Sequence, residues 1–131
     1  MPNVFLSHSA RDAKLAAAIR RELRKHGVEA FDVSEDGAPA KYDRQAIKAA
    51  IRRADGLVLV IGAPEAASTS WATYELGMAE ALGKPILTLL SHRHAASELP
   101  PDLAGLPMAA FDPARAELAA REVVDRLLAA A

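Results

Sequence analysis

The sequence predicts an α/β fold in which helices cover both faces of a mostly parallel sheet. Short β-rich runs alternate along the chain with longer stretches of helical periodicity, and this alternation is typical of βαβ units. The apolar run 57–62 is unbroken, as expected of a strand that is buried on both faces. A chain of 131 residues has the size of one domain. We therefore expect a single domain over 1–131.

The first third of the chain contains the first two expected strands. A strand over 3–8 leads to a helix for which Ser9 or Asp12 is the candidate N-cap. This helix should stop at His26–Gly27, because glycine is favoured just beyond the end of a helix, and a second strand over 28–33 follows. The apolar positions of the helix follow a 3.6-residue period and are Leu15, Ala18, Ile19 and Leu23.

The middle of the chain repeats this pattern. Residues 34–43, SEDGAPAKYD, have the composition of a loop, and a helix over about 42–54 precedes the buried strand. The next helix should begin near Ser70 and end at Gly83–Lys84–Pro85, ahead of a fourth strand over 86–90.

The last part of the chain completes the sheet. We expect a long connection with one short helix, then a short edge strand over 108–111 and a helix that begins at Pro113. Five strands that alternate with helices predict a flavodoxin-like, doubly wound parallel sheet in the order 2-1-3-4-5. In that order the crevice between the carboxyl ends of the first and third strands is the expected ligand site.

Composition argues against several classes of function. The formal net charge is −1, which gives no reason to expect nucleic acid or an anionic membrane as a partner. The absence of cysteine excludes disulfides, thiolate zinc sites and a cysteine nucleophile. No signal peptide or apolar stretch of about 18 residues is found. We expect a soluble cytoplasmic protein.

Glu75 is the most informative polar residue, because helical periodicity places it in the middle of an apolar face, where a carboxylate is costly to bury. A glutamate near the start of a helix could instead lean out to solvent and interact favourably with the helix dipole. The functional alternative is a carboxylate in a half-apolar cleft, with its pKa raised by desolvation, that binds a ribose or stabilises a developing cation. The apolar face consists of Trp71, Leu76, Met78, Ala79 and Leu82.

A single carboxylate restricts the glycosidic chemistry that Glu75 could perform. Ordinary glycosidases use two carboxylates, one of which protonates the leaving group, and the sequence places no second carboxylate beside Glu75. A cationic leaving group that departs neutral, such as the nicotinamide of NAD, needs no acid. One carboxylate that stabilises an oxocarbenium-like transition state would then be sufficient.

Other polar or aromatic residues converge on the same crevice. Ser7 and His8 end the first strand, but successive strand residues point to opposite faces, which argues against a nucleophile and base pair. His8 is either a packed loop histidine or a ligand contact. Asp32, at the end of the second strand, is either a surface charge or a residue that contacts a ligand or a loop amide. Trp71 either packs in the core or shields Glu75 from water. The candidate substrate-binding residues are Ser7, His8, Asp32, Ser70 and Trp71.

Metal and phosphate-loop chemistry are not indicated. His92 and His94 occupy alternate positions, but they lack a third ligand and the chain has no cysteine, so a solvated loop is the better interpretation. The glycine-rich fingerprints of phosphate and dinucleotide loops are absent. We expect no metal and no cofactor.

The chain resembles a Toll/interleukin-1 receptor (TIR) domain of the bacterial type over nearly its whole length. VFLSHSARD, at 4–12, resembles the first sequence box of that family, and GVEAFDV, at 27–33, resembles its second strand. The most specific likeness is the S-x-W-x-x-x-E-L helix, which combines Trp71 and Glu75 with the Gly83–Lys84 exit at a fixed spacing.

The resemblance implies an NAD-consuming enzyme in which Glu75 is the catalytic glutamate of the W-x-x-x-E motif. The implied reaction cleaves the nicotinamide–ribose bond of NAD, the substrate, and gives nicotinamide with ADP-ribose or a cyclic isomer; we predict a role in immunity against phage. It also implies self-association, in which the loop after the second strand completes a neighbour's site. Here that loop, 34–43, is short and lacks a large apolar residue ahead of its glycine.

Two other classes of function remain open. Some members of the family are adaptors that bind only their own kind. Nucleoside deoxyribosyltransferases have a similar sheet and a glutamate helix that ELGMAEALGKP, at 75–85, resembles. Those enzymes use the glutamate as a nucleophile and typically need a nearby aspartate, whereas the stretch before Glu75 has no acidic residue.

Overall fold

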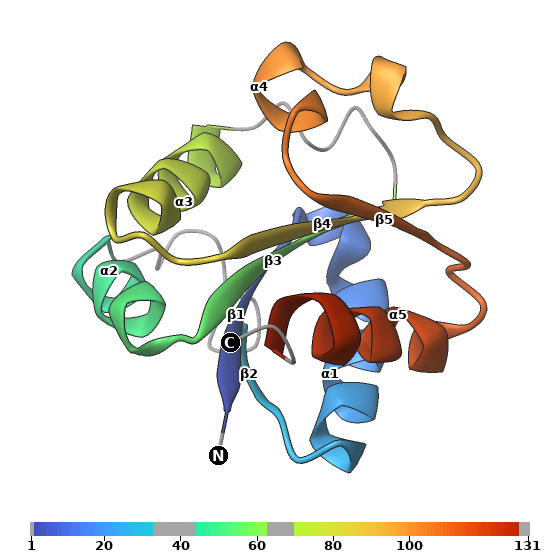
Figure 1. Ribbon diagram of the computed structural model, residues 1–131, viewed down its shortest axis with the longest axis horizontal. Coiled ribbons are helices and arrows are strands. Elements are labelled where there is room, and N and C mark those ends of the chain that lie inside the picture. The colour runs from blue at the N-terminus through green and yellow to red at the C-terminus, as the bar shows by residue number, and fades with distance from the viewer. Residues whose placement is uncertain (1, 33–43, 63–69, 129–131) are drawn as a thin grey trace.

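The computed structural model describes residues 2–32, 44–62 and 70–128, apart from the side chains of Asp32, of residues 70–72 and of Asp102. The described strands form one parallel sheet in the order β2-β1-β3-β4-β5 (Figure 1), which confirms the predicted topology. The strands are β1 (Asn3–Ser7), β2 (Glu29–Asp32), β3 (Gly56–Ile61), β4 (Ile86–Ser91) and β5 (Met108–Phe111).

The helices lie in two layers, with α1 and α5 on one face of the sheet and α2 and α3 on the other (Figure 1). The described helices are α1 (Ala13–Lys25), α2 (Arg44–Arg53), α3 (Ser70–Ala81), α4 (Pro101–Ala104) and α5 (Ala116–Val123). A 3-10 turn over Ala10–Asp12 precedes α1, and a π-helical turn over Val124–Leu128 follows α5.

Alternation along the strands separates the two halves of the core. On β1, Val4 and Leu6 pack in the cluster under α1 and α5, whereas Phe5 packs in the cluster under α2 and α3. Successive strand residues point to opposite faces, so Ser7 shares the face of Phe5. All six residues of β3 are buried, as predicted for the central strand.

Two glycines end helices where the sequence predicted. Gly27 and Gly83 have φ angles of 76° and 68°, a left-handed conformation that glycine adopts without a steric penalty. After α1, the amides of Gly27 and Val28 donate to the carbonyls of Arg24 and Leu23, which is a Schellman motif. The same motif follows α3, where the amides of Gly83 and Lys84 donate to Glu80 and Ala79.

The structure corrects one helical boundary and adds one helical turn. The last helix begins at Ala116 rather than at Pro113, because the backbone first makes a turn in which the amide of Arg115 donates to the carbonyl of Asp112. The connection before β5 contains a 3-10 turn over Ala96–Glu98 in addition to α4. No helix in the described part of the chain is long and apolar enough to cross a membrane.

Candidate functional site

The candidate site is built around a hydrogen bond between the end of β1 and the middle of α3. Ser7 Oγ donates to Glu75 Oε1 at 2.6 Å, and the two residues are 1% and 2% exposed. Because Ser7 shares the strand face of Phe5, its hydroxyl is directed toward the layer that contains α3. Glu75 is therefore buried at the carboxyl end of β1, and a glutamate that leans out to solvent is excluded.

The surroundings of Glu75 match the predicted apolar face. Leu76 and Ala79 are buried, and Met78 and Leu82 are partly buried against the same core cluster. Glu80, on the same helix, is exposed. A buried carboxylate needs hydrogen-bond donors to offset its desolvation, and a hydroxyl that donates to an ionised carboxylate makes one of the stronger protein hydrogen bonds.

A second buried carboxylate, Asp12, lies where the chain leaves β3. Asp12 is 8% exposed, and its Oδ2 accepts hydrogen bonds from the amide of Gly62 at 3.1 Å and from Ser9 Oγ at 3.4 Å. Neither the Ser9 nor the Asp12 side chain makes a capping hydrogen bond to the helical turns that follow. Asp12 does occupy the predicted N-cap position of α1, but its carboxylate is engaged by an amide 50 residues away rather than by the first turn of the helix.

His8 is partly buried, and its Nδ1 donates to the carbonyl of Ser9 at 2.8 Å. The Ser7 hydroxyl donates to Glu75. The serine is thus not prepared as a nucleophile by its neighbouring histidine, in agreement with the alternation argument. A ligand contact by His8 stays a prediction.

Three of the predicted site residues are placed only by their backbone. Asp32 ends β2 and pairs in register with Leu6 of β1, and Ser70 and Trp71 begin α3. The side chains of these three residues, like the predicted loop over 34–43, lie outside the described part of the structure. Their contacts with a substrate stay predictions.

His92 and His94 face two different carboxylates. His92 Nε2 lies 3.4 Å from Asp112 Oδ1, and His94 Nδ1 lies 3.3 Å from Glu98 Oε1. The amide of Ala95, together with His94, holds the pKa of Glu98 below its usual value. In the ranges that the structure describes, no cluster of three or more potential ligands could hold a metal ion.

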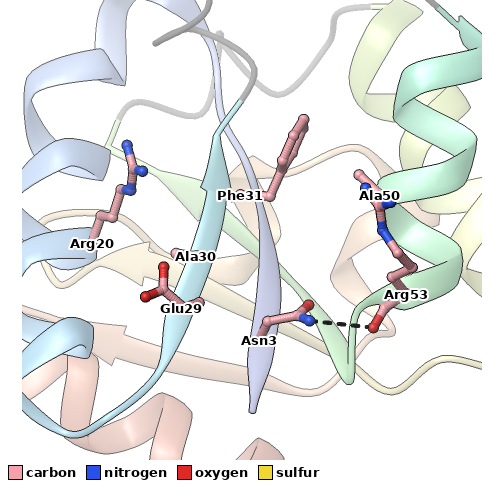
Figure 2. Close-up of a pocket in the computed structure, with 7 residues that line it drawn as sticks. All are labelled: Asn3, Arg20, Glu29, Ala30, Phe31, Ala50 and Arg53. Carbon is pink, nitrogen blue, oxygen red and sulfur yellow. Dashed lines mark hydrogen bonds between the residues drawn. The ribbon is translucent and has the colours of Figure 1, made fainter. Parts of the chain in front are cut away.

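A cavity of about 290 Å³ lies at the free side of β2, away from Glu75. Figure 2 shows Arg20 on one side of β2, and Phe31 with Arg53 on the other. The Asn3 side-chain amide donates to the carbonyl of Arg53 at 3.4 Å. Because Asn3 and Glu29 begin their strands, this cavity extends to the amino ends of the sheet, opposite the crevice in which doubly wound folds bind ligands.

Comparison with known proteins identifies the family. Residues 4–128 match the family model described as TIR domain, so the chain belongs to the TIR family. No curated protein matches the chain significantly.

Solved structures of low sequence identity share the fold. The TIR domain heterodimer of RPS4 and RRS1 is 17% identical, with a TM-score of 0.71 over 97% of this chain and 99% of that one. A metazoan TIR-STING receptor from C. gigas, in complex with 2',3'-cGAMP, is 19% identical with a TM-score of 0.68 over 89% of this chain. This chain spans 38% of that receptor. A 2-deoxyribosyltransferase from Bacillus psychrosaccharolyticus is 19% identical, with a TM-score of 0.63 over 88% of this chain and 90% of that one.

Proposed function

We propose that this TIR domain cleaves the nicotinamide–ribose bond of NAD, as an NAD glycohydrolase or an ADP-ribosyl cyclase. The observation that carries the proposal is the buried Glu75 carboxylate, which accepts a hydrogen bond from Ser7 at the carboxyl end of β1. That end of the sheet, beside β3, is where doubly wound folds bind ligands. The W-x-x-x-E spacing of Trp71 and Glu75, which resembles that of NAD-cleaving members of the family, supports the same reaction.

In the proposed reaction the carbon–nitrogen bond between ribose and nicotinamide breaks, and its electron pair stays on the nicotinamide nitrogen. The positively charged nicotinamide group becomes neutral as it leaves, so no general acid is required. Positive charge develops on the ribose, and the Glu75 carboxylate stabilises it. Water then adds to the ribose carbon, a proton is released and ADP-ribose forms; attack by a nitrogen of the adenine ring gives the cyclic product instead.

Ser7 positions Glu75 in this scheme. A hydroxyl that donates to one carboxylate oxygen favours the ionised form and restricts the side chain to one orientation. Preorganisation of this kind lowers the cost of reorganising the site during the reaction. His8, Asp32, Ser70 and Trp71 complete the proposed set of substrate contacts at the same crevice.

We further propose that the domain acts in the cytoplasm, in bacterial immunity against phage, and that self-association activates it. RPS4 and RRS1 form a TIR domain heterodimer, which motivates contacts between TIR domains here. A dependence of the rate on protein concentration is the expected sign of such activation.

A nucleoside 2-deoxyribosyltransferase is the second candidate function. The ELGMAEALGKP stretch that begins at Glu75 and the similarity to the Bacillus psychrosaccharolyticus enzyme favour it. In that reaction the Glu75 carboxylate would attack the sugar as a nucleophile. A Glu75 side chain that points into solvent would have favoured the non-catalytic adaptor alternative, whereas Glu75 is buried.

The decisive experiment measures nicotinamide release from NAD at high protein concentration. We expect Glu75→Gln to lower the rate by at least about 100-fold, because it keeps the shape of the side chain and removes its charge. Glu80→Gln, an exposed position on the same helix, should retain the wild-type rate. Equal turnover by the wild type and Glu75→Gln would exclude the mechanism, and base exchange from a deoxynucleoside without reaction on NAD would favour the second candidate.

A further inference from the structure

The Asp12 carboxylate connects two segments beyond the last residue pair of β1 and β3. The ladder between these strands ends with Ser7 opposite Leu59, and β3 itself ends at Ile61. Past this point, Asp12 Oδ2 accepts the amide hydrogen of Gly62. This contact therefore extends the connection between the first and third strands beyond the last residue of β3.

The fit between Asp12 and Gly62 leaves no space for a side chain on the glycine. A Cβ atom built on Gly62 would lie 2.5 Å from Asp12 Oδ1 and 3.4 Å from Leu15 Cδ2. Real Cβ atoms essentially never approach another heavy atom as closely as 2.5 Å, so an alanine at this position would require Asp12 or the backbone to move. Asp12 thus both accepts the hydrogen bond of the Gly62 amide and packs against its Cα.

Two hydrogen bonds from one short stretch of sequence reach the end of β3 and the middle of α3. Ser7 contacts Glu75 on α3, and Asp12 contacts Gly62 at the end of β3. Both residues belong to SHSARD, at 7–12. The same short segment therefore contacts both the Glu75 side chain and the backbone just past the end of β3.

We propose that Asp12 is a positioning residue of the crevice, which fixes the backbone at Gly62 and thereby the alignment of Glu75 with Ser7. The inference rests on the proposed function for its kinetic consequence alone. The role requires a hydrogen-bond acceptor of the right length at position 12, because the partner is a neutral amide. Asparagine can supply that acceptor, whereas alanine cannot.

The test compares Asp12→Ala, Asp12→Asn and Leu127→Ala with the wild type. Leu127 packs over Gly56 at the amino end of β3, so its truncation weakens the fold at the opposite end of the sheet. For each folded protein, kcat and KM for NAD are measured, together with the carbon-13 signal of the Glu75 carboxyl and the hydrogen exchange of the Gly62 amide.

We expect Asp12→Ala to lower kcat by about 10- to 100-fold, because small misplacements of a catalytic group have effects of this size, with a smaller change in KM. It should also shift the Glu75 signal and accelerate exchange at Gly62. Asp12→Asn should retain most of kcat, and Leu127→Ala should leave both the Glu75 signal and kcat per folded molecule unchanged.

The outcomes separate this inference from the proposed function. A folded Asp12→Ala protein with the wild-type kcat and an unchanged Glu75 signal would overturn the positioning role. Equal impairment of Asp12→Asn and Asp12→Ala would overturn it as well, since charge rather than alignment would then be required. If the wild type does not cleave NAD, the proposed function fails, and the Glu75 signal together with the Gly62 exchange still decides the role of Asp12.

Discussion

Ser7 and Glu75 are 68 residues apart in the sequence, and the hydroxyl of the first donates to the carboxylate of the second at 2.6 Å in the interior of the protein. The contact joins the central part of the sheet to α3. It also explains how a carboxylate can occupy the apolar face of a helix, because its charge is partly compensated by a fixed donor.

Removal of this donor should lower both stability and activity. We expect Ser7→Ala to reduce the free energy of unfolding by about 1–3 kcal/mol, the usual cost of leaving a buried polar group without one of its partners. Chemical denaturation of both proteins measures the difference. Ser97→Ala, at an exposed position, is the control, and a fully stable Ser7→Ala protein would show that the hydrogen bond contributes nothing to folding.

Substitution by alanine should change the stability of the fold in opposite directions at Gly62 and at Gly77. At Gly62 a Cβ would meet Asp12 Oδ1 at 2.5 Å, whereas at Gly77 no atom lies within 4 Å of the added carbon. We expect Gly62→Ala to destabilise the fold by about 1–3 kcal/mol. Gly77→Ala should stabilise it by about 0.5–1 kcal/mol, because alanine loses less backbone entropy in a helix. Thermal unfolding of the two variants tests the contrast, which equal shifts of the same sign would contradict.

The buried hydroxyl of Thr88 should lower the stability of the fold rather than raise it. Thr88 is fully buried on β4 between Leu59 and Met108 of the neighbouring strands, and its Oγ1 has no hydrogen-bond partner among the described residues. We expect Thr88→Val to raise the free energy of unfolding by about 1 kcal/mol, because valine has no hydroxyl that must lose its hydration when the protein folds. A loss of stability would instead indicate a partner such as a buried water molecule. Thr73→Val, on the exposed face of α3, is the control.

The sequence was sufficient for the topology because the local signals agree with one another. The helix ends at Gly27 and Gly83 depend on backbone conformations that glycine favours, and the order of strands follows from the alternation of strands and helices. Part of the site was predictable for the same reason. The period of α3 predicts Glu75 on an apolar face, and the strand order brings the end of β1 to the same crevice; that Ser7 faces α3 is seen only in the structure.

The role of Asp12 could not be predicted, because its partner is a backbone amide. Every residue except proline has such an amide. No pattern of side chains in the sequence therefore indicates that the Gly62 amide, rather than another, donates to Asp12. The late start of the last helix has a similar cause. The Asp112 carboxylate accepts the amide of Ala114 and stabilises a turn in which the sequence predicted the first helical residues.

Asp112 should contribute to stability in a pH-dependent way. The amide of Ala114 donates to its Oδ1 at 2.9 Å, and this hydrogen bond, followed by the nearby His92, lowers the pKa of Asp112 below its usual value. A carboxyl whose pKa is lower in the folded state contributes stability above its unfolded pKa, and this contribution is lost as the pH falls through the lowered folded pKa.

The difference in unfolding free energy between the wild type and Asp112→Ala should therefore be larger at neutral pH than in acid. Denaturation curves across the acidic range measure it, and a carbon-13 titration of the Asp112 carboxyl reports the pKa directly. Asp125→Ala, an exposed aspartate near the end of the chain for which no such donor is found among the described residues, is the control. A difference that stays constant with pH would mean that the ionised carboxylate has no preferential interaction with Ala114.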